Sequence, residues 1–188
     1  MKIIFGLGTP GAEYAKNYHN LGYMVLDKVA EALGCDIIKK GKKSLYGEAV
    51  FSGERVLLVK PLTYMNLSGE CVSEYLNFYK CDLNDVLVIY DDIDIDKGAI
   101  RFKPSGLAGT HNGMRNITKL INSQNFPRLR IGAKNTNPEI PLINYVLMNI
   151  PKADMQIIEP ALDRAKNCAL DFFKGVSFDE LMCEYNRR

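Results

Sequence analysis

The sequence predicts a single α/β domain over residues 1–188, in which a mixed, twisted β-sheet is flanked by helices. Short apolar runs alternate with amphipathic helical patterns, which is typical of α/β folds. The continuous apolar run Val86–Tyr90 is typical of a strand buried on both faces, as in parallel sheets. Two β-type runs joined across Ser52–Glu54 predict a hairpin, so antiparallel pairing is expected as well.

The first half of the chain alternates apolar runs with turn residues. Continuous or alternating apolar runs predict strands, whereas apolar residues three and four apart predict helices. Gly34 is expected to end the first helix. The expected elements are a strand at 2–5, a helix at 21–33, a strand near 37–38, a hairpin of strands at 46–51 and 55–60, and a helix around 72–79 that follows Asn66 and Ser68.

The second half continues the same alternation of strands and helices. Ser177–Glu180 has the Ser-x-x-Glu pattern of a capping box, which predicts the start of a short final helix. Pro138 and Pro141 predict a loop. The expected elements are a strand at 86–90, a strand near 100–102, a glycine-rich segment at 104–113, a helix ending at Leu120, a strand at 129–132 and a long helix at 155–174.

Composition sets the broad class of the protein. The apolar and charged fractions, 47% and 24%, are those of an ordinary soluble globular protein. Five cysteines are scattered without a Cys-x-x-Cys pair, which predicts reduced thiols and a cytoplasmic location. No apolar run is long enough to span a bilayer, and the opening residues do not resemble a signal peptide. With a net charge of only +2, nucleic-acid binding would require a local basic patch.

A glycine-rich turn beside a histidine is the first candidate for chemistry. Gly6, Gly8 and Gly11 follow the first strand, and His19 comes shortly afterwards, just before the first helix. Glycines let the backbone approach a ligand closely. Histidine exchanges protons near neutral pH without a large pKa shift. We therefore expect a ligand-binding turn with a proton-transfer group beside it.

Two other interpretations of these residues are less well supported. The glycine spacing matches the dinucleotide-binding fingerprint, but Pro10 and the segment up to His19 separate it from the helix, and the second strand does not end in an acid. His19, His111 and one aspartate among Asp91, Asp92 and Asp94 form a possible metal site. No local ligand spacing supports that metal site. Serine hydrolase chemistry is disfavoured because no Gly-x-Ser-x-Gly motif is present.

A metal-free hydrolase that activates water is the third interpretation. His19 would act as general base, and Asp91, at the carboxyl end of the buried strand, would orient its ring. Ligands of α/β sheets bind at the carboxyl ends of the strands. Asn66 and Asn112 carry amides that can orient a carbonyl group or a water molecule. Each of these residues also has an ordinary structural explanation, such as a helix cap or a turn.

Several motifs in succession resemble the bacterial-type peptidyl-tRNA hydrolase family. The opening Gly6–Gly11 turn with Tyr14 and His19 resembles the first motif of that family, and Lys60–Gly69 resembles its second. The later motifs follow in the order and approximate spacing of the family: Asp91–Asp94, Arg101–Lys103, His111–Gly113 and Arg128–Gly132. The resemblance extends from the first strand to the C-terminal helix.

The resemblance implies a monomeric α/β enzyme that needs no cofactor or metal and cleaves the ester between a peptide and the 3′ ribose of tRNA. His19 would be the general base and Asp91 its partner. The other roles implied are substrate or water binding by Asn66 and Asn112, lining of the site by Thr9, Tyr14, Tyr64 and Met65, and contacts to tRNA phosphates by Lys103 and Arg130. Phosphate contacts give sequence-independent affinity, which suits an enzyme acting on every tRNA.

The sequence departs from the family pattern where the substrate is expected to bind. Thr9 stands where the family has asparagine, a residue that the resemblance assigns to recognition of the peptidyl group. Other departures are Asn17–Tyr18 before the histidine, Leu107 and Thr110 in the glycine-rich segment, and Ala133–Lys134 after the last strand. These departures leave a non-catalytic RNA-binding relative as an alternative. The presence of both His19 and Asp91 favours the hydrolase.

Overall fold

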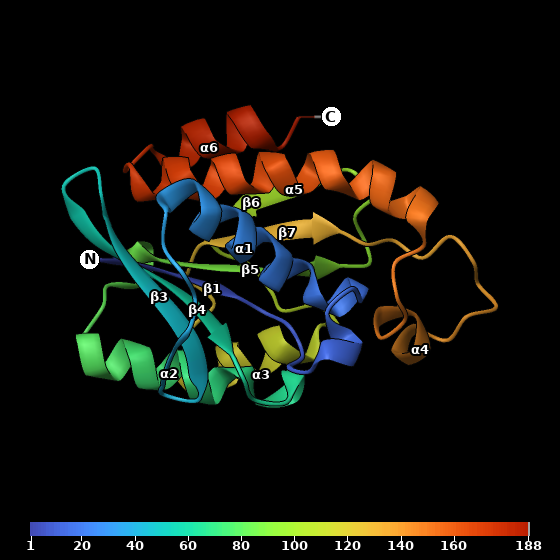
Figure 1. The fold of residues 1–188 in the computed structure, drawn as a ribbon, viewed down its shortest axis with the longest axis horizontal. Helices are drawn as coiled ribbons and strands as arrows, with labels where there is room; N and C mark the ends of the chain where they lie inside the picture. The colour runs from blue at the N-terminus through green and yellow to red at the C-terminus, as the bar shows by residue number, and fades with distance from the viewer. Residues whose placement is uncertain (188) are drawn as a thin grey trace.

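The computed structural model describes residues 1–187 and contains one seven-stranded sheet between two layers of helices (Figure 1). Helices α5 and α6 run along one side of the sheet, and α2 and α3 run along the other. The strands are β1 Lys2–Gly6, β2 Lys39–Gly41, β3 Ser44–Phe51, β4 Glu54–Pro61, β5 Val86–Asp92, β6 Ile100–Lys103 and β7 Arg128–Gly132. The α-helices are α1 Leu21–Leu33, α2 Ser68–Tyr79, α3 Asn112–Ile121, α4 Leu142–Val146, α5 Lys152–Phe173 and α6 Phe178–Tyr185.

The sheet has a parallel centre and antiparallel edges. The strand order is β2-β3-β4-β1-β5-β7-β6. β1 pairs in parallel with β4 and β5, and β5 pairs in parallel with β7. β2–β3–β4 at one edge and β6–β7 at the other pair antiparallel. The predicted mixed sheet of an α/β fold is therefore confirmed.

The two faces of the sheet bury separate hydrophobic cores. One core joins the sheet to α1, α5 and α6 and includes Ile89, Phe102 and Leu129. The other joins it to α2 and α3 and includes Val88 and Tyr90. Alternation along β5 thus sends neighbouring side chains to opposite cores, and the strand is buried on both faces as its sequence predicts.

The predicted position of the second strand, near residues 37–38, is wrong, because β2 lies at Lys39–Gly41. Lys42 and Lys43 both have positive φ, 49° and 58°, and form a two-residue hairpin loop that pairs Gly41 with Ser44. A loop with both central residues at positive φ matches the twist of a hairpin, so pairing starts directly beside it. Lysine does not normally predict this turn, and Ile38 is left 72% exposed outside the strand.

The predicted helices form, with corrections at their ends. Gly34 ends α1 in the left-handed conformation, and the Ser177 hydroxyl accepts from the Glu180 N–H at the start of α6, as its capping box predicts. The long helix α5 begins at Lys152, directly after Pro151. Asn112 opens α3 rather than preceding it, because His111 is the N-cap residue. The five-residue helix α4 was not expected in the loop after Pro141.

Parallel pairing brings the ends of distant segments to one edge of the sheet. The carboxyl ends of β1, β4 and β5 lie side by side. The turn at Gly8–Thr9 follows β1, the Tyr64–Asn66 segment follows β4, and Asp91 is the last residue but one of β5. Gly22 lets α1 approach this edge closely, since a Cβ at Gly22 would lie 2.5 Å from the Leu7 nitrogen and the Ile89 oxygen. His19, three residues before Gly22, is thereby placed against the end of β5.

Candidate active site

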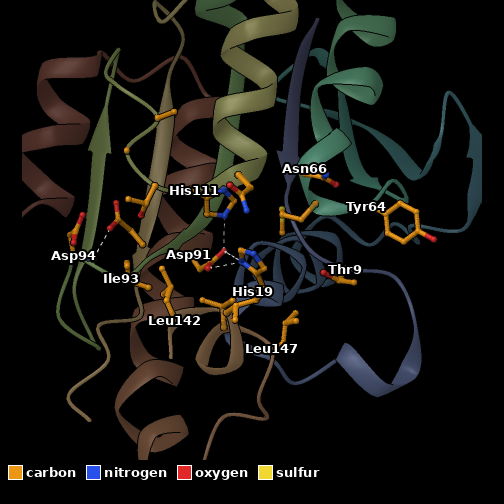
Figure 2. Close-up of a pocket in the computed structure, with 18 of the residues that line it drawn as sticks. Thr9, His19, Tyr64, Asn66, Asp91, Ile93, Asp94, His111, Leu142 and Leu147 are labelled. Atoms are coloured by element: carbon orange, nitrogen blue, oxygen red, sulfur yellow. Dashed lines mark hydrogen bonds and ion pairs between the residues drawn. The ribbon is translucent and has the colours of Figure 1, made fainter. Parts of the chain in front are cut away.

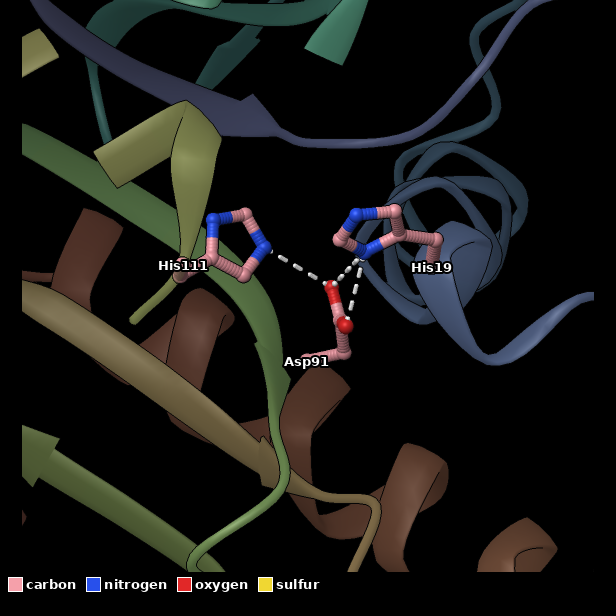
Figure 3. A group of neighbouring side chains, drawn as sticks. All are labelled: His19, Asp91 and His111. Atoms are coloured by element: carbon pink, nitrogen blue, oxygen red, sulfur yellow. Dashed lines mark hydrogen bonds and ion pairs between the residues drawn. The ribbon is translucent and has the colours of Figure 1, made fainter. Parts of the chain in front are cut away.

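Two histidines converge on one buried carboxylate at the end of β5 (Figure 3). Nδ1 of His19 lies 2.8 Å from Oδ2 and 3.0 Å from Oδ1 of Asp91. Nε2 of His111 lies 3.0 Å from Oδ1 of the same carboxylate. Asp91 is only 2% exposed, so both rings separate its charge from solvent.

The hydrogen bonds indicate which ring nitrogen of each histidine carries the proton. The Met114 N–H donates to Nδ1 of His111, so the proton of neutral His111 is on Nε2, which donates to Asp91. His19 faces the carboxylate with Nδ1, so that nitrogen carries its proton. Nε2 of His19 is then the unprotonated nitrogen, and it lies on the side of the ring away from Asp91. The arrangement is that of a base whose tautomer is fixed by an acid.

Electrostatics keep Asp91 ionised and make His19 more basic. Burial acts to raise the pKa of Asp91, but the charges and hydrogen bonds of His19 and His111 outweigh it and hold that pKa far below the usual range. Burial acts to lower the pKa of His19, and the Asp91 carboxylate outweighs that effect, so the net shift is upward. A buried carboxylate therefore stabilises the imidazolium that forms when His19 accepts a proton.

The geometry of the group is that of hydrogen bonds rather than metal coordination. His19, Asp91 and His111 could each offer a ligand atom, and these atoms lie within 4.8 Å of one another. Both ring nitrogens are directed at the carboxylate itself, at 2.8 to 3.0 Å. A metal ion bound by both rings would have to replace the N–H protons that make these hydrogen bonds, including the one on Nε2 of His111.

A cleft of about 590 Å³ opens beside this group and gathers the predicted site residues (Figure 2). His19 and Asp91 lie in its wall together with all six residues expected to contact substrate: Thr9, Tyr14, Tyr64, Met65, Asn66 and Asn112. Met65 is buried, whereas the Tyr64 ring is 77% exposed at the cleft. The cleft thus combines a polar centre with partly apolar walls.

Comparison with known proteins now decides the family. The family model described as "Peptidyl-tRNA hydrolase" matches residues 3–188. The chain belongs to the peptidyl-tRNA hydrolase family. Relatives named peptidyl-tRNA hydrolase include one from Alkaliphilus metalliredigens, 46% identical over 187 residues, and one from Thermoanaerobacter sp. (strain X514), 42% identical over 186 residues. In both cases 99% of this chain and 100% of the relative are covered.

Solved structures of the same family have the same fold. The peptidyl-tRNA hydrolase of Acinetobacter baumannii superposes with a TM-score of 0.92 at 31% identity, covering 99% of this chain and 94% of that one. A peptidyl-tRNA hydrolase solved in complex with N-propanol has the same TM-score at 32% identity, with the same coverage. No helix within residues 1–187 has the length and apolar character needed to cross a membrane.

In this family member the glycine-rich turn forms part of the cleft wall. The first helix does not begin within the turn, as the dinucleotide fingerprint requires, but at Leu21. Asn20 holds the turn in place, because its side chain accepts from the Thr9 N–H at 2.6 Å and donates to the Thr9 carbonyl at 3.0 Å. The sequence analysis did not predict this role of Asn20. The one signal for it in the sequence is that Asn20 lies between His19 and the start of α1.

An apolar wall contributed by α4 was also missed. Leu142, Ile143, Val146 and Leu147 line the cleft from the segment after Pro141. Figure 2 shows Leu142 and Leu147 on one side of the His19–Asp91 pair, with His111 and Asn66 on the other. Their spacing, i, i+1, i+4 and i+5, is that of one helical face, but a pattern of little more than one turn does not distinguish a helix from a loop.

The two expected phosphate ligands lie outside the cleft, on the edge strand β6 and on its neighbour β7. Lys103 is exposed on β6, and Arg130 on β7 donates through Nη1 to Oδ2 of Asp92 at 3.1 Å. Asp92 itself lines the cleft. Arg130 is therefore connected to the cleft wall through this ion pair.

Proposed function

We propose that this protein hydrolyses peptidyl-tRNA by means of a water molecule that His19 activates. The observation that carries the proposal is the contact between His19 Nδ1 and the buried Asp91 carboxylate, which leaves Nε2 as a base beside the cleft of a peptidyl-tRNA hydrolase family member. A positioned base of this kind contributes about 10²–10⁴-fold to a rate.

The reaction balances with residues of this chain alone. Nε2 of His19 takes a proton from water as the water oxygen attacks the ester carbonyl, and Asp91 stabilises the resulting imidazolium. The bond between the carbonyl carbon and the 3′ oxygen of the ribose then breaks. His19 returns its proton to that oxygen, which releases tRNA and a peptide with a free carboxyl group.

Substrate groups are assigned by the chemistry of the cleft walls. The exposed amides of Asn66 and Asn112 are suited to hold the ester carbonyl or the attacking water. Thr9 on the glycine-rich turn and Tyr14 in the short 3-10 helix that follows it would face the peptidyl group, and Tyr64 and Met65 line the same cleft. Lys103 and Arg130 would contact tRNA phosphates outside the cleft. We further propose that the protein acts as a monomer in the cytoplasm, where its substrate is found.

The test is a turnover assay on N-blocked aminoacyl-tRNA, with free aminoacyl-tRNA as the control substrate. His19→Ala is expected to abolish nearly all ester cleavage while leaving tRNA affinity within a few-fold of the unmodified protein. Near-normal turnover by His19→Ala would refute the mechanism. Activity that falls with chelator and returns with added metal would establish the two-histidine metal site instead. Salt-dependent tRNA binding without any cleavage would identify a non-catalytic RNA-binding relative.

A further inference from the structure

Four cationic side chains occupy one face of the β6–β7 pair. The strand register places Arg101 opposite Arg130 and Lys103 opposite Arg128. The intervening residues, among them Phe102 and Leu129, point into the core beneath α1, α5 and α6. Because side chains alternate along a strand, the four cations share the opposite face. We call these four residues the cationic block.

Like charges opposite one another destabilise a strand pair, so the cationic block needs compensation. Arg128 is 1% exposed and directs its guanidinium at the carbonyl oxygens of Phe126, Leu107 and Gln124, which offer no formal charge. Within residues 1–187, the only carboxylate at ion-pair distance from any of the four is Asp92, which pairs with Arg130. The three cations that reach the surface, Arg101, Lys103 and Arg130, are matched by one carboxylate, so this part of the block is positive, as expected of a surface that receives phosphate.

The Asp92–Arg130 pair is incompletely satisfied. The two side chains are 14% and 22% exposed, so the pair lies between the cleft and solvent. Nε of Arg130 is buried and has no hydrogen-bond partner. Asp92 is better anchored, because its Oδ1 accepts from the Asp94 N–H at 2.8 Å while Oδ2 accepts from Arg130. Arg130 is therefore the partner with unused donors.

We propose that Asp92 is an internal counter-ion that competes with tRNA phosphate for Arg130 and thereby weakens tRNA binding. The proposal rests on the proposed function, since it takes tRNA as the anion. In the free protein Asp92 neutralises one charge of the cationic block. In the complex a phosphate oxygen takes its place on Arg130, and the carboxylate remains held by the backbone of Asp94. The weaker hold on the RNA favours release of the deacylated product.

Asp92→Asn separates the two functions of this side chain. An asparagine oxygen still accepts from the Asp94 N–H, whereas the atom facing Arg130 becomes an amide donor and the ion pair is lost. The Kd for deacylated tRNA is expected to fall roughly threefold to fivefold, the size of a partly exposed ion pair. The dependence of log Kd on log salt is expected to steepen by about one unit, as for one added phosphate contact. KM should fall with Kd, while the pH midpoint of kcat/KM stays unchanged.

Two further variants show whether Arg130 carries the effect. Asp94→Asn removes an equal charge two residues further along the chain. Asp94 is exposed and makes no ion pair with the cationic block, so its effect on Kd should be smaller at 0.15 M salt, where the Debye length is about 8 Å. In an Arg130→Gln background, Asp92→Asn should no longer tighten binding. Equal effects of Asp92→Asn and Asp94→Asn, or a gain that survives Arg130→Gln, would overturn the proposal. Failure of the proposed function is distinguishable, because the unmodified protein would then not cleave the ester.

Discussion

Replacing Asp91 with asparagine tests the proposed base most directly. The carboxylate contacts His19 Nδ1 through both oxygens and also accepts from His111, so the substitution removes one charge and leaves at most one acceptor oxygen. Two unit charges 4 Å apart interact by about 4 kcal/mol at an effective dielectric constant of 20. At 1.36 kcal/mol per decade, removing that stabilisation from the imidazolium lowers kcat/KM by about 10³-fold.

The same variant is expected to shift the pH profile in a defined direction. His19 acts as a base only when neutral, so activity is lost as pH falls through its pKa. Asp91 raises that pKa above the ordinary histidine value of 6.5, and burial alone would lower it. Without Asp91 the burial effect remains, so the acid limb of kcat/KM should move to lower pH while the plateau falls. Because the pH dependence of kcat/KM reports pKa values of the free enzyme, this midpoint reflects the pKa of His19 without bound substrate.

Initial rates on N-blocked aminoacyl-tRNA across pH 5–9 provide the measurement, with circular dichroism to verify folding and His19→Ala as the baseline. A folded Asp91→Asn protein that keeps its plateau within about tenfold and its midpoint unchanged would refute the role of Asp91 as partner of the base. A plateau loss without the downward shift of the midpoint would mean that Asp91 orients His19 without setting its pKa.

Three further predictions concern the residues around this pair. His111→Ala should lower the free energy of unfolding in urea by about 2–4 kcal/mol, because both the α3 cap and the bond to Asp91 are lost. His111→Asn, which can still cap α3, should lose less than His111→Ala. Thr9→Asn should raise activity, or the preference for blocked over free aminoacyl-tRNA, by about 2–10-fold, the value of one hydrogen bond of about 0.5–1.5 kcal/mol. An unchanged activity and an unchanged ratio of kcat/KM for the two substrates would show that threonine is compensated elsewhere. Gly22→Ala should lower the free energy of unfolding in urea by about 3 kcal/mol, because the added Cβ would clash with backbone atoms. In the control variant Gly34→Ala the added methyl group meets no atom within 4 Å, and the positive φ of that residue should lower the free energy of unfolding by about 1–2 kcal/mol. Equal losses for the two alanine variants would contradict the steric argument.

The elements that the sequence predicted well are those whose burial is visible in their composition. The run Val86–Tyr90 is apolar throughout because β5 is covered on both faces. The position of β2 was wrong because its register depends on a turn of two lysines at positive φ, a conformation that lysine does not signal. The helix α4 is five residues long, too short for apolar periodicity to distinguish it from the surrounding loop.

Among the site residues too, some roles are visible in the sequence and others depend on local geometry that the sequence does not reveal. His19 and Asp91 are 72 residues apart in sequence, and motif resemblance together with the strand-end rule brought them together in the prediction. The part played by His111 could not be predicted, because it depends on the N-cap of α3 fixing its tautomer. Arg130 was expected to face phosphate, and its pairing with Asp92 was not expected, since side-chain partners across strands depend on a register that sequence does not reveal.

Two adjacent aspartates can serve different partners because a strand alternates. Asp92 shares a sheet face with Tyr90 and, across the β5–β7 pair, with Arg130. Asp91 follows Ile89 toward the other face, where the η2 turn, Tyr18–Asn20, places His19 against it. One carboxylate is enclosed by two imidazoles, and the other lies at the cleft wall within reach of a guanidinium. Shifting this strand by one residue would exchange the two environments, so the register of β5 with β1 and β7 is itself a requirement for function.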